Sequence, residues 1–168
     1  HLWEPFSDRF AGKYHTTRNL YKNEFGNKVL FEEINHDLEL TFQYQWNSTN
    51  TFGFIKKSKL INNSTSKIEV NVLDGIQNIL PYGVGSDLQN ASSNLVDAYK
   101  RSELDKSSGL GIYALSAIIV DKAEPSEALK ANIVWSLGLD NSKYLLSSLQ
   151  LDSFRKQQEL SQETEVKA

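Results

Sequence analysis

Alternation of apolar and polar residues is the strongest structural signal in the chain. It runs without a break from Leu38 to Trp46, and shorter stretches of it recur at 67–73 and 129–135. A period of two predicts a strand with one face against a core and the other face in water or in a polar cleft. We therefore predict β-strands over all three ranges.

Residues 53–73 predict the hairpin around which the other elements are organised. Apolar residues lead into the polar cluster 62–66, whose short side chains bond local backbone and favour turns. On the predicted return strand, Val70 and the apolar residues two positions before and after it share one face. The polar, glycine-containing loop 74–83 follows the strand, and loops at strand ends commonly hold binding groups.

Turn residues and helical spacing place the remaining elements. Gly26, in the polar stretch after Tyr21, predicts an earlier hairpin with glycine at a positive φ. Residues 86–101 predict a helix, because Ser86 is a capping residue and apolar residues recur on one face. We also predict a strand at 110–120, turns at 124–126 and 138–142, and a last strand or the start of a helix at 144–149.

Together these elements predict a mainly β fold. We expect an antiparallel β-sandwich with one inserted α-helix, formed as a single domain over residues 1–168. The apolar positions of the strands should be buried on facing sheet surfaces. The predicted core comprises Leu40, Phe42, Val70, Ile133 and Trp135.

Composition narrows the classes of function. With 168 residues, 39% of them hydrophobic, the chain is long enough to bury a core. Its net charge of −3 and lack of a basic block argue against a nucleic-acid partner, and no apolar run approaches the roughly 20 residues of a membrane span. The absence of cysteine excludes disulfides, thiolate zinc sites and a cysteine nucleophile, and is compatible with bacterial cytoplasm or periplasm. Because methionine is also absent, we expect a processed product or, as we favour, a piece of a longer protein.

Two acids and a histidine are the candidates for catalysis. Glu32 and Glu33 are adjacent, so on a strand they point to opposite faces and cannot form a catalytic pair with each other. His36 precedes Asp37 at a predicted turn, where the simplest role of the aspartate is to bond local backbone. The three histidines lack the spacing of metal ligands, so we predict neither a metal site nor a cofactor.

Aromatic rings beside amides and carboxylates indicate carbohydrate binding. Ring faces accept the C–H groups of a sugar, while amides and acids bond its hydroxyls. The loop 74–83 has this mixture, and the strand 38–46 ends on a tryptophan. The predicted contact residues are Asp74, Gln77, Asn78, Tyr82 and Trp46. The competing interpretation is that the apolar residues of the loop tuck under the sheet and its polar groups satisfy its own backbone.

The predicted hairpin also resembles a known family. Residues 57–64 and 67–73 are similar to paired strands in the N-terminal sugar-handling sandwich of cellobiose phosphorylases and their relatives. The stretches 73–82 (LDGIQNILPY) and 120–135 resemble bacterial proteins related to those phosphorylases, so the similarity covers about residues 20–150. The resemblance implies a galactose-mutarotase-like antiparallel sandwich. In that family a separate (α/α) barrel carries the catalytic acid and the phosphate site, so no catalytic residue of the family falls on this chain.

The leading functional hypothesis is a non-catalytic carbohydrate-associated domain of a larger glycoside phosphorylase or hydrolase. Its expected partners are a glucoside or oligosaccharide and the remainder of the parent chain. One alternative is a small mutarotase-like epimerase that uses His36 as acid and Glu32 or Glu33 as base. The other alternative is a purely structural β domain without a ligand.

Overall fold

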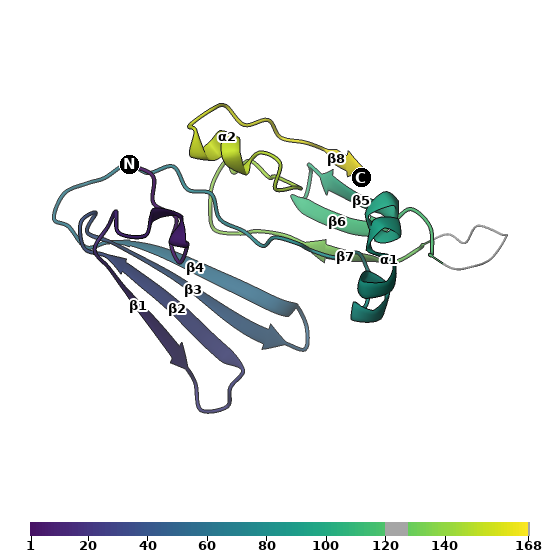
Figure 1. Cartoon of the computed structure of the whole chain (residues 1–168), viewed down its shortest axis with the longest axis horizontal. Coiled ribbons are helices and arrows are strands. Elements are labelled where there is room, and N and C mark those ends of the chain that lie inside the picture. Colours follow the sequence, from purple (N-terminus) through teal and green to yellow (C-terminus); the bar gives the residue numbers. More distant parts are fainter. Residues whose placement is uncertain (120–127, 168) are drawn as a thin grey trace. The chain divides into compact units, whose positions relative to one another are not determined.

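The computed structural model describes residues 1–119 and 128–167. The chain divides into two compact units, residues 1–74 (unit 1) and 75–168 (unit 2). Each unit contains one four-stranded antiparallel sheet (Figure 1). The predicted fold class, mainly β and antiparallel with one principal helix, is confirmed and is consistent with a β-sandwich-like fold. The expectation of a single domain stays a prediction.

Unit 1 is a four-stranded meander in the order β1-β2-β3-β4. Short polar turns join its strands, so each strand pairs with the next one in the sequence. Gly26 has a φ of 70° in the turn between the first two strands, which confirms the predicted hairpin. The strands are β1 (Thr16–Lys22), β2 (Lys28–Asn35), β3 (Leu40–Thr49) and β4 (Gly53–Asn62).

The strand predicted at 38–46 is confirmed as β3, with its start two residues later. The side-chain oxygen of Asn35 accepts a 3.0 Å hydrogen bond from the Leu38 backbone N–H, and Glu39 has a φ of 52°. These two features hold the first residues of the predicted range in the turn between β2 and β3. β3 then continues to Thr49, beyond the end of the alternating pattern.

The return strand predicted at 67–73 is wrong. Residues 67–80, all within the described chain, have no regular secondary structure, and Val70 is 45% exposed. Side-chain bonds replace the expected backbone ladder. The Asn62 side-chain amide donates to the Ser66 carbonyl, and Lys56 forms an ion pair with Asp74. The chain thus reverses direction after β4, as predicted. Residues 67–73 nevertheless do not form a strand, because their alternating pattern does not supply a neighbouring strand for their backbone to pair with.

One face of the unit 1 sheet carries a cluster of aromatic rings, and the N-terminal segment packs against it. This segment contains the 3-10 helix η1 (Asp8–Phe10). The Phe6 ring meets those of Phe31, Phe42 and Tyr44 edge-on, at 5.1 to 6.4 Å between centroids. The rings of Phe31 and Tyr44 stack at 4.7 Å. Such pairs each contribute about 0.5–1.5 kcal/mol beyond the area that they bury.

Glu33 lies buried on the same face and ties the N-terminal segment to the sheet. Its Oε1 accepts a 2.8 Å bond from the Trp3 indole N–H, and its Oε2 accepts a 2.8 Å bond from the Phe6 backbone N–H. The Arg18 guanidinium donates to Oε2 at 2.7 Å. With its side chain only 2% exposed, the carboxylate requires these three donors to offset its loss of water.

The described part of unit 2 contains the second sheet, in the order β7-β6-β5-β8, and two helices. Its strands are β5 (Lys100–Asp105), β6 (Leu110–Leu115), β7 (Ala131–Val134) and β8 (Glu165–Lys167), and its helices are α1 (Ser86–Tyr99) and α2 (Leu151–Arg155).

The predicted strand 129–135 is confirmed as β7, and the strand 110–120 is confirmed as β6 up to residue 115. The turn predicted at 124–126 lies outside the described residues. The range 138–142 turns as predicted, with Gly138 at a φ of 103°, whereas 144–149 forms neither a strand nor a helix.

The predicted helix is confirmed as α1, but it is kinked. Ser92 has a non-helical φ of −146° in its middle, and Gly85 rather than Ser86 occupies the N-cap position. Because the kink interrupts the helical period, the predicted apolar face is not continuous. Val96 is the one buried residue of α1, and its neighbour Leu95 is exposed.

The predicted core is correct in part. Leu40 is buried and Phe42 is half-buried among the aromatic rings. Val70, Ile133 and Trp135 are exposed, at 45%, 55% and 41%, so these three predictions are wrong. Val70 has no sheet to pack in. Ile133 lies on the edge strand β7, and Trp135 follows the end of that strand, so neither has strands on both sides to enclose it.

Glu33→Ala should destabilise unit 1 by about 3 kcal/mol. The substitution removes three charge-assisted hydrogen bonds, each worth about 1.5–3 kcal/mol, while solvent partly compensates the half-exposed Arg18. Chemical denaturation measures the change. Glu24→Ala, in the exposed turn between β1 and β2, is the matched control and should cost less than about 0.5 kcal/mol. A loss below about 1 kcal/mol for Glu33→Ala would contradict the role assigned to this carboxylate.

Gly109→Ala should cost about 2–3 kcal/mol in the turn between β5 and β6. Gly109 has a φ of 70°, and an added Cβ would lie 3.0 Å from the Tyr144 hydroxyl oxygen. Gly26→Ala shares the φ of 70° but meets no atom within 4 Å, so it should cost only the backbone strain of about 1 kcal/mol. Equal losses of unfolding free energy in the two variants would show that contact with Tyr144 is unimportant.

Candidate functional site

The five residues predicted to contact a sugar are divided between the two units. Trp46 and Asp74 belong to unit 1, whereas Gln77, Asn78 and Tyr82 belong to unit 2. The predicted residues therefore form two separate groups, one in each unit.

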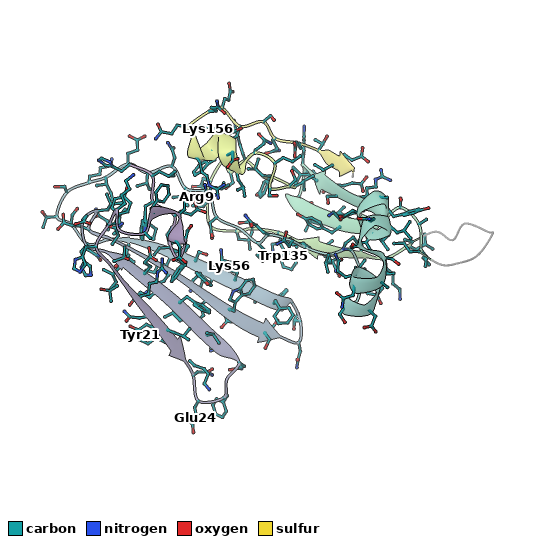
Figure 2. All side chains as sticks on the ribbon, in the orientation of Figure 1. Arg9, Tyr21, Glu24, Lys56, Trp135 and Lys156 are labelled. Atoms are coloured by element: carbon teal, nitrogen blue, oxygen red, sulfur yellow. The ribbon has the colours of Figure 1, made fainter. Side chains whose placement is uncertain are left out.

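In unit 1, Lys56 connects the two predicted residues. Trp46 on β3 lies directly opposite Lys56 on β4, and the Lys56 ammonium forms an ion pair with the Asp74 carboxylate. Lys56 is labelled in Figure 2. The same ammonium lies 5.4 Å from the centroid of the Tyr44 ring. Trp46 is half-buried, so its ring is held in place while part of it remains accessible. We call Trp46, Lys56 and Asp74 the Trp46 patch.

The predicted residues of unit 2 lie on the irregular segment before α1. Gln77 and Asn78 are exposed, and Asn78 has a φ of 57°. Tyr82 is also exposed, with the Lys130 ammonium 5.2 Å from its ring centroid. The Asn132 side chain on β7 donates a 2.8 Å bond to the Leu80 carbonyl, which anchors the segment to the unit 2 sheet. Two interpretations of these residues stay predictions: that they contact a sugar, and that they only satisfy the backbone of their own loop.

A polar cluster that the sequence did not predict lies on the other face of the unit 1 sheet. The Glu32 carboxylate accepts hydrogen bonds from the Asn19 amide at 2.9 Å, the Gln43 amide at 2.5 Å and the Tyr21 hydroxyl at 3.1 Å. The bond from Asn19, followed by those from Gln43 and Tyr21, lowers the pKa of Glu32. The bond to Glu32 in turn raises the pKa of Tyr21. The cluster presents a fixed carboxylate surrounded by amides.

Only the pairing of the strands brings this cluster together. The register of β1 on β2 places Asn19 opposite Glu32, and the register of β2 on β3 places Gln43 opposite the same residue. The alternation in the sequence shows which positions of the strand are polar. It does not show which residues of the neighbouring strands lie opposite them, because that register depends on the lengths of two turns.

Beside this cluster, the end of the β1–β2 hairpin forms an open groove of about 240 Å³. It begins next to Tyr21, whose hydroxyl belongs to the Glu32 cluster. The lining residues come from β1, the hairpin turn, β2 and β3. They are Tyr21, Lys22, Asn23, Lys28, Leu30 and Gln45, and we call this site the hairpin groove.

The three residues considered for catalysis are held apart in unit 1. Both oxygens of Glu33 accept hydrogen bonds on the aromatic face, whereas Glu32 bonds on the opposite face, as the alternation predicts. His36 is exposed at the far end of β2, where its ring lies 4.6 Å from that of His15 and its Nε2 is 2.8 Å from the Thr17 hydroxyl. Among the described residues no group of three or more acids and histidines is arranged to hold a metal ion.

No protein-family model matches the chain, and no curated protein matches it either. Neither described helix has the length and apolar composition needed to cross a membrane.

The Glu32 cluster should make the stability of unit 1 depend on pH. A carboxylate with a lowered pKa stabilises the fold above its unfolded pKa of about 4.3, and this contribution is lost as pH falls through the lower folded value. The wild type should therefore be more stable than Glu32→Gln between about pH 5 and 7, and the difference should shrink below about pH 4. Urea unfolding of both proteins across this range measures it, and a difference that does not change with pH would contradict the prediction.

Proposed function

We propose that the chain is a non-catalytic, carbohydrate-associated β domain and that the Trp46 patch is its saccharide contact. The observation that carries the proposal is the position of Lys56, which faces Trp46 across the β3–β4 register and pairs with Asp74. A flat ring thus stands beside an ammonium and a carboxylate that hold each other in place. This combination fits a sugar, whose C–H face packs on the ring and whose hydroxyls bond the charged groups.

The neighbouring residues extend the apolar part of this surface. Phe54 shares the face of β4 with Lys56, two positions along the strand, and its side chain is 80% exposed. Ser48 lies opposite Phe54 and adds a hydroxyl. An elongated surface of this kind suits an oligosaccharide better than a single sugar, because several rings can lie along it.

The positions of Glu32, Glu33 and His36 also fit a binding role better than they fit mutarotase-like catalysis. The Glu33 carboxylate is sequestered by its three donors. Glu32 and His36 are four residues apart, which on extended backbone is roughly 13 Å. That separation is long for an acid and a base that act on one sugar ring.

The resemblance to cellobiose phosphorylase-related proteins implies a role of this kind, although the pairing of residues 57–64 with 67–73 that it implied is not formed. A galactose-mutarotase-like sandwich in a cellobiose phosphorylase-related enzyme accompanies a separate catalytic domain. On this basis the ligand is a glucoside or an oligosaccharide, and the second partner is the rest of a parent chain that carries the chemistry.

Trp46→Ala should weaken the binding of cellotetraose about tenfold. Loss of an aromatic contact at the centre of a binding surface commonly costs more than 1 kcal/mol, and 1.4 kcal/mol corresponds to a factor of ten. Isothermal titration calorimetry on the wild type and the variant measures the affinity.

The control is Trp135→Ala, the same substitution at an exposed tryptophan of unit 2, which should leave the affinity unchanged. Two results would refute the proposal: no heat of binding in the wild type, or equal affinities for the wild type and Trp46→Ala.

A further inference from the structure

The exposed apolar side chains of unit 1 gather at one end of its sheet. The β1–β2 and β3–β4 turns lie at this end, away from η1 (Figure 1). Among residues 1–62, every large hydrophobic residue that is exposed lies in one of these two turns or close beside it. They are Leu20, Tyr21, Phe25, Phe52 and Phe54, and we call this end of the sheet the apolar tip. Apolar side chains that are concentrated in this way, rather than scattered singly, indicate an interaction site.

Local hydrogen bonds hold both turns while their phenylalanines remain in solvent. In the β1–β2 turn the Gly26 backbone N–H donates to the Asn23 carbonyl at 3.1 Å, and Phe25 is 87% exposed. In the β3–β4 turn the Phe52 backbone N–H donates to the Thr49 hydroxyl at 2.8 Å, and Phe52 is 58% exposed. Rings on two separate turns fit a deformable apolar medium better than a saccharide, which needs one continuous surface.

The apolar tip is positively charged in a chain that is negatively charged as a whole. Residues 20–30 and 45–57 contain four lysines and one glutamate, whereas the net charge of the chain is −3. Within the described chain only Lys56 of these lysines forms an ion pair, with Asp74. The glutamate is Glu24, at the end of the β1–β2 hairpin (Figure 2). Exposed rings among unpaired lysines are complementary to an anionic lipid surface.

The two lysines that flank the β1–β2 turn lie on opposite faces of the sheet. Lys22 shares the face of Trp46, because both lie opposite Val29 in the strand register. Lys28 precedes Val29 on β2 and therefore points to the other face. A hairpin that enters a membrane end-on has lipid headgroups on both of its faces, so each ammonium can reach a headgroup of its own. A small ligand bound on one face would use only one of the two.

We propose that unit 1 docks by its apolar tip on a membrane that contains anionic phospholipids. The rings of Phe25 and Phe52 enter the boundary between headgroups and acyl chains, and the lysines bind the surrounding headgroups. Interfacial binding places apolar groups about 5–10 Å into this boundary and needs no membrane-spanning segment. Trp46 lies roughly 10 Å before the end of β3, so the Trp46 patch stays outside the acyl layer. The inference goes beyond the proposed carbohydrate function and does not depend on it.

The test is sedimentation of the whole chain with phosphatidylcholine vesicles that contain either phosphatidylserine or no anionic lipid. The wild type should bind the anionic vesicles at least about tenfold more tightly than the neutral ones, and raising salt from about 50 to 500 mM should reduce the difference. Phe25→Ser with Phe52→Ser should weaken binding at least about tenfold, because two exposed rings no longer enter the apolar layer. Lys22→Gln with Lys28→Gln should reduce the preference for anionic vesicles.

Two matched controls make the same changes away from the tip. Leu137→Ser with Leu139→Ser alters exposed apolar residues of unit 2 and should leave vesicle binding unchanged. Lys59→Gln with Lys67→Gln removes the same charge at exposed residues farther from both turns and should retain the anionic preference. Urea unfolding of each variant should match the wild type, because every substituted side chain is exposed.

Three results would overturn the inference. The first is equal binding to anionic and neutral vesicles, or binding to neither. The second is vesicle binding that survives Phe25→Ser with Phe52→Ser. The third is a wild-type dimer in light scattering that this variant dissociates without any vesicle binding, which would assign the tip to a second copy of the chain.

Cellotetraose titration separates this inference from the proposed function. If the phenylalanine variant loses cellotetraose binding instead of vesicle binding, the tip is a saccharide contact and the inference is wrong. If the wild type binds anionic vesicles as expected but does not bind cellotetraose, the inference stands and only the proposed function fails.

Discussion

The burial of Glu33 is the constraint on which the arrangement of unit 1 depends. A carboxylate removed from water needs donors, and these come from Trp3 and Phe6 in the N-terminal segment and from Arg18 on β1. The two N-terminal donors fix that segment against the sheet, and the Phe6 ring then packs among the aromatic residues of β2 and β3. The carboxylate therefore determines which part of the aromatic face is covered.

The residues proposed to bind ligands lie toward the other end of the same sheet. Trp46 pairs in register with Val29, close to the turn that carries the hairpin groove. Its neighbour Gln45 lines that groove from the opposite face, because successive strand residues point in opposite directions. One end of a thin sheet can thus present two chemically different surfaces: a ring with an ion pair on one face, and a groove that contains the Gln45 amide on the other.

The sequence predicted the strands and turns that local residue patterns determine. It missed the features that depend on contacts between residues far apart in the chain. β3, β4 and the hairpin at Gly26 were found because alternation and turn residues specify them locally. Residues 67–73 carry an equally clear pattern but no backbone partner, which a pattern cannot reveal. Trp46 and Asp74 were singled out by residue type, but Lys56, which joins them, was not. The role of Glu33 depends on Trp3, 30 residues earlier, and no local signal connects the two.

The indole N–H signals of the three tryptophans provide the most direct test of this account. In a ¹H–¹⁵N spectrum recorded during titration with cellotetraose, the Trp46 signal should shift with ligand concentration. The Trp3 signal should be slow to exchange with solvent and should not move, because its N–H is bonded to Glu33. The Trp135 signal should also stay in place. A stationary Trp46 signal, or a Trp3 signal that exchanges rapidly with water, would contradict the account.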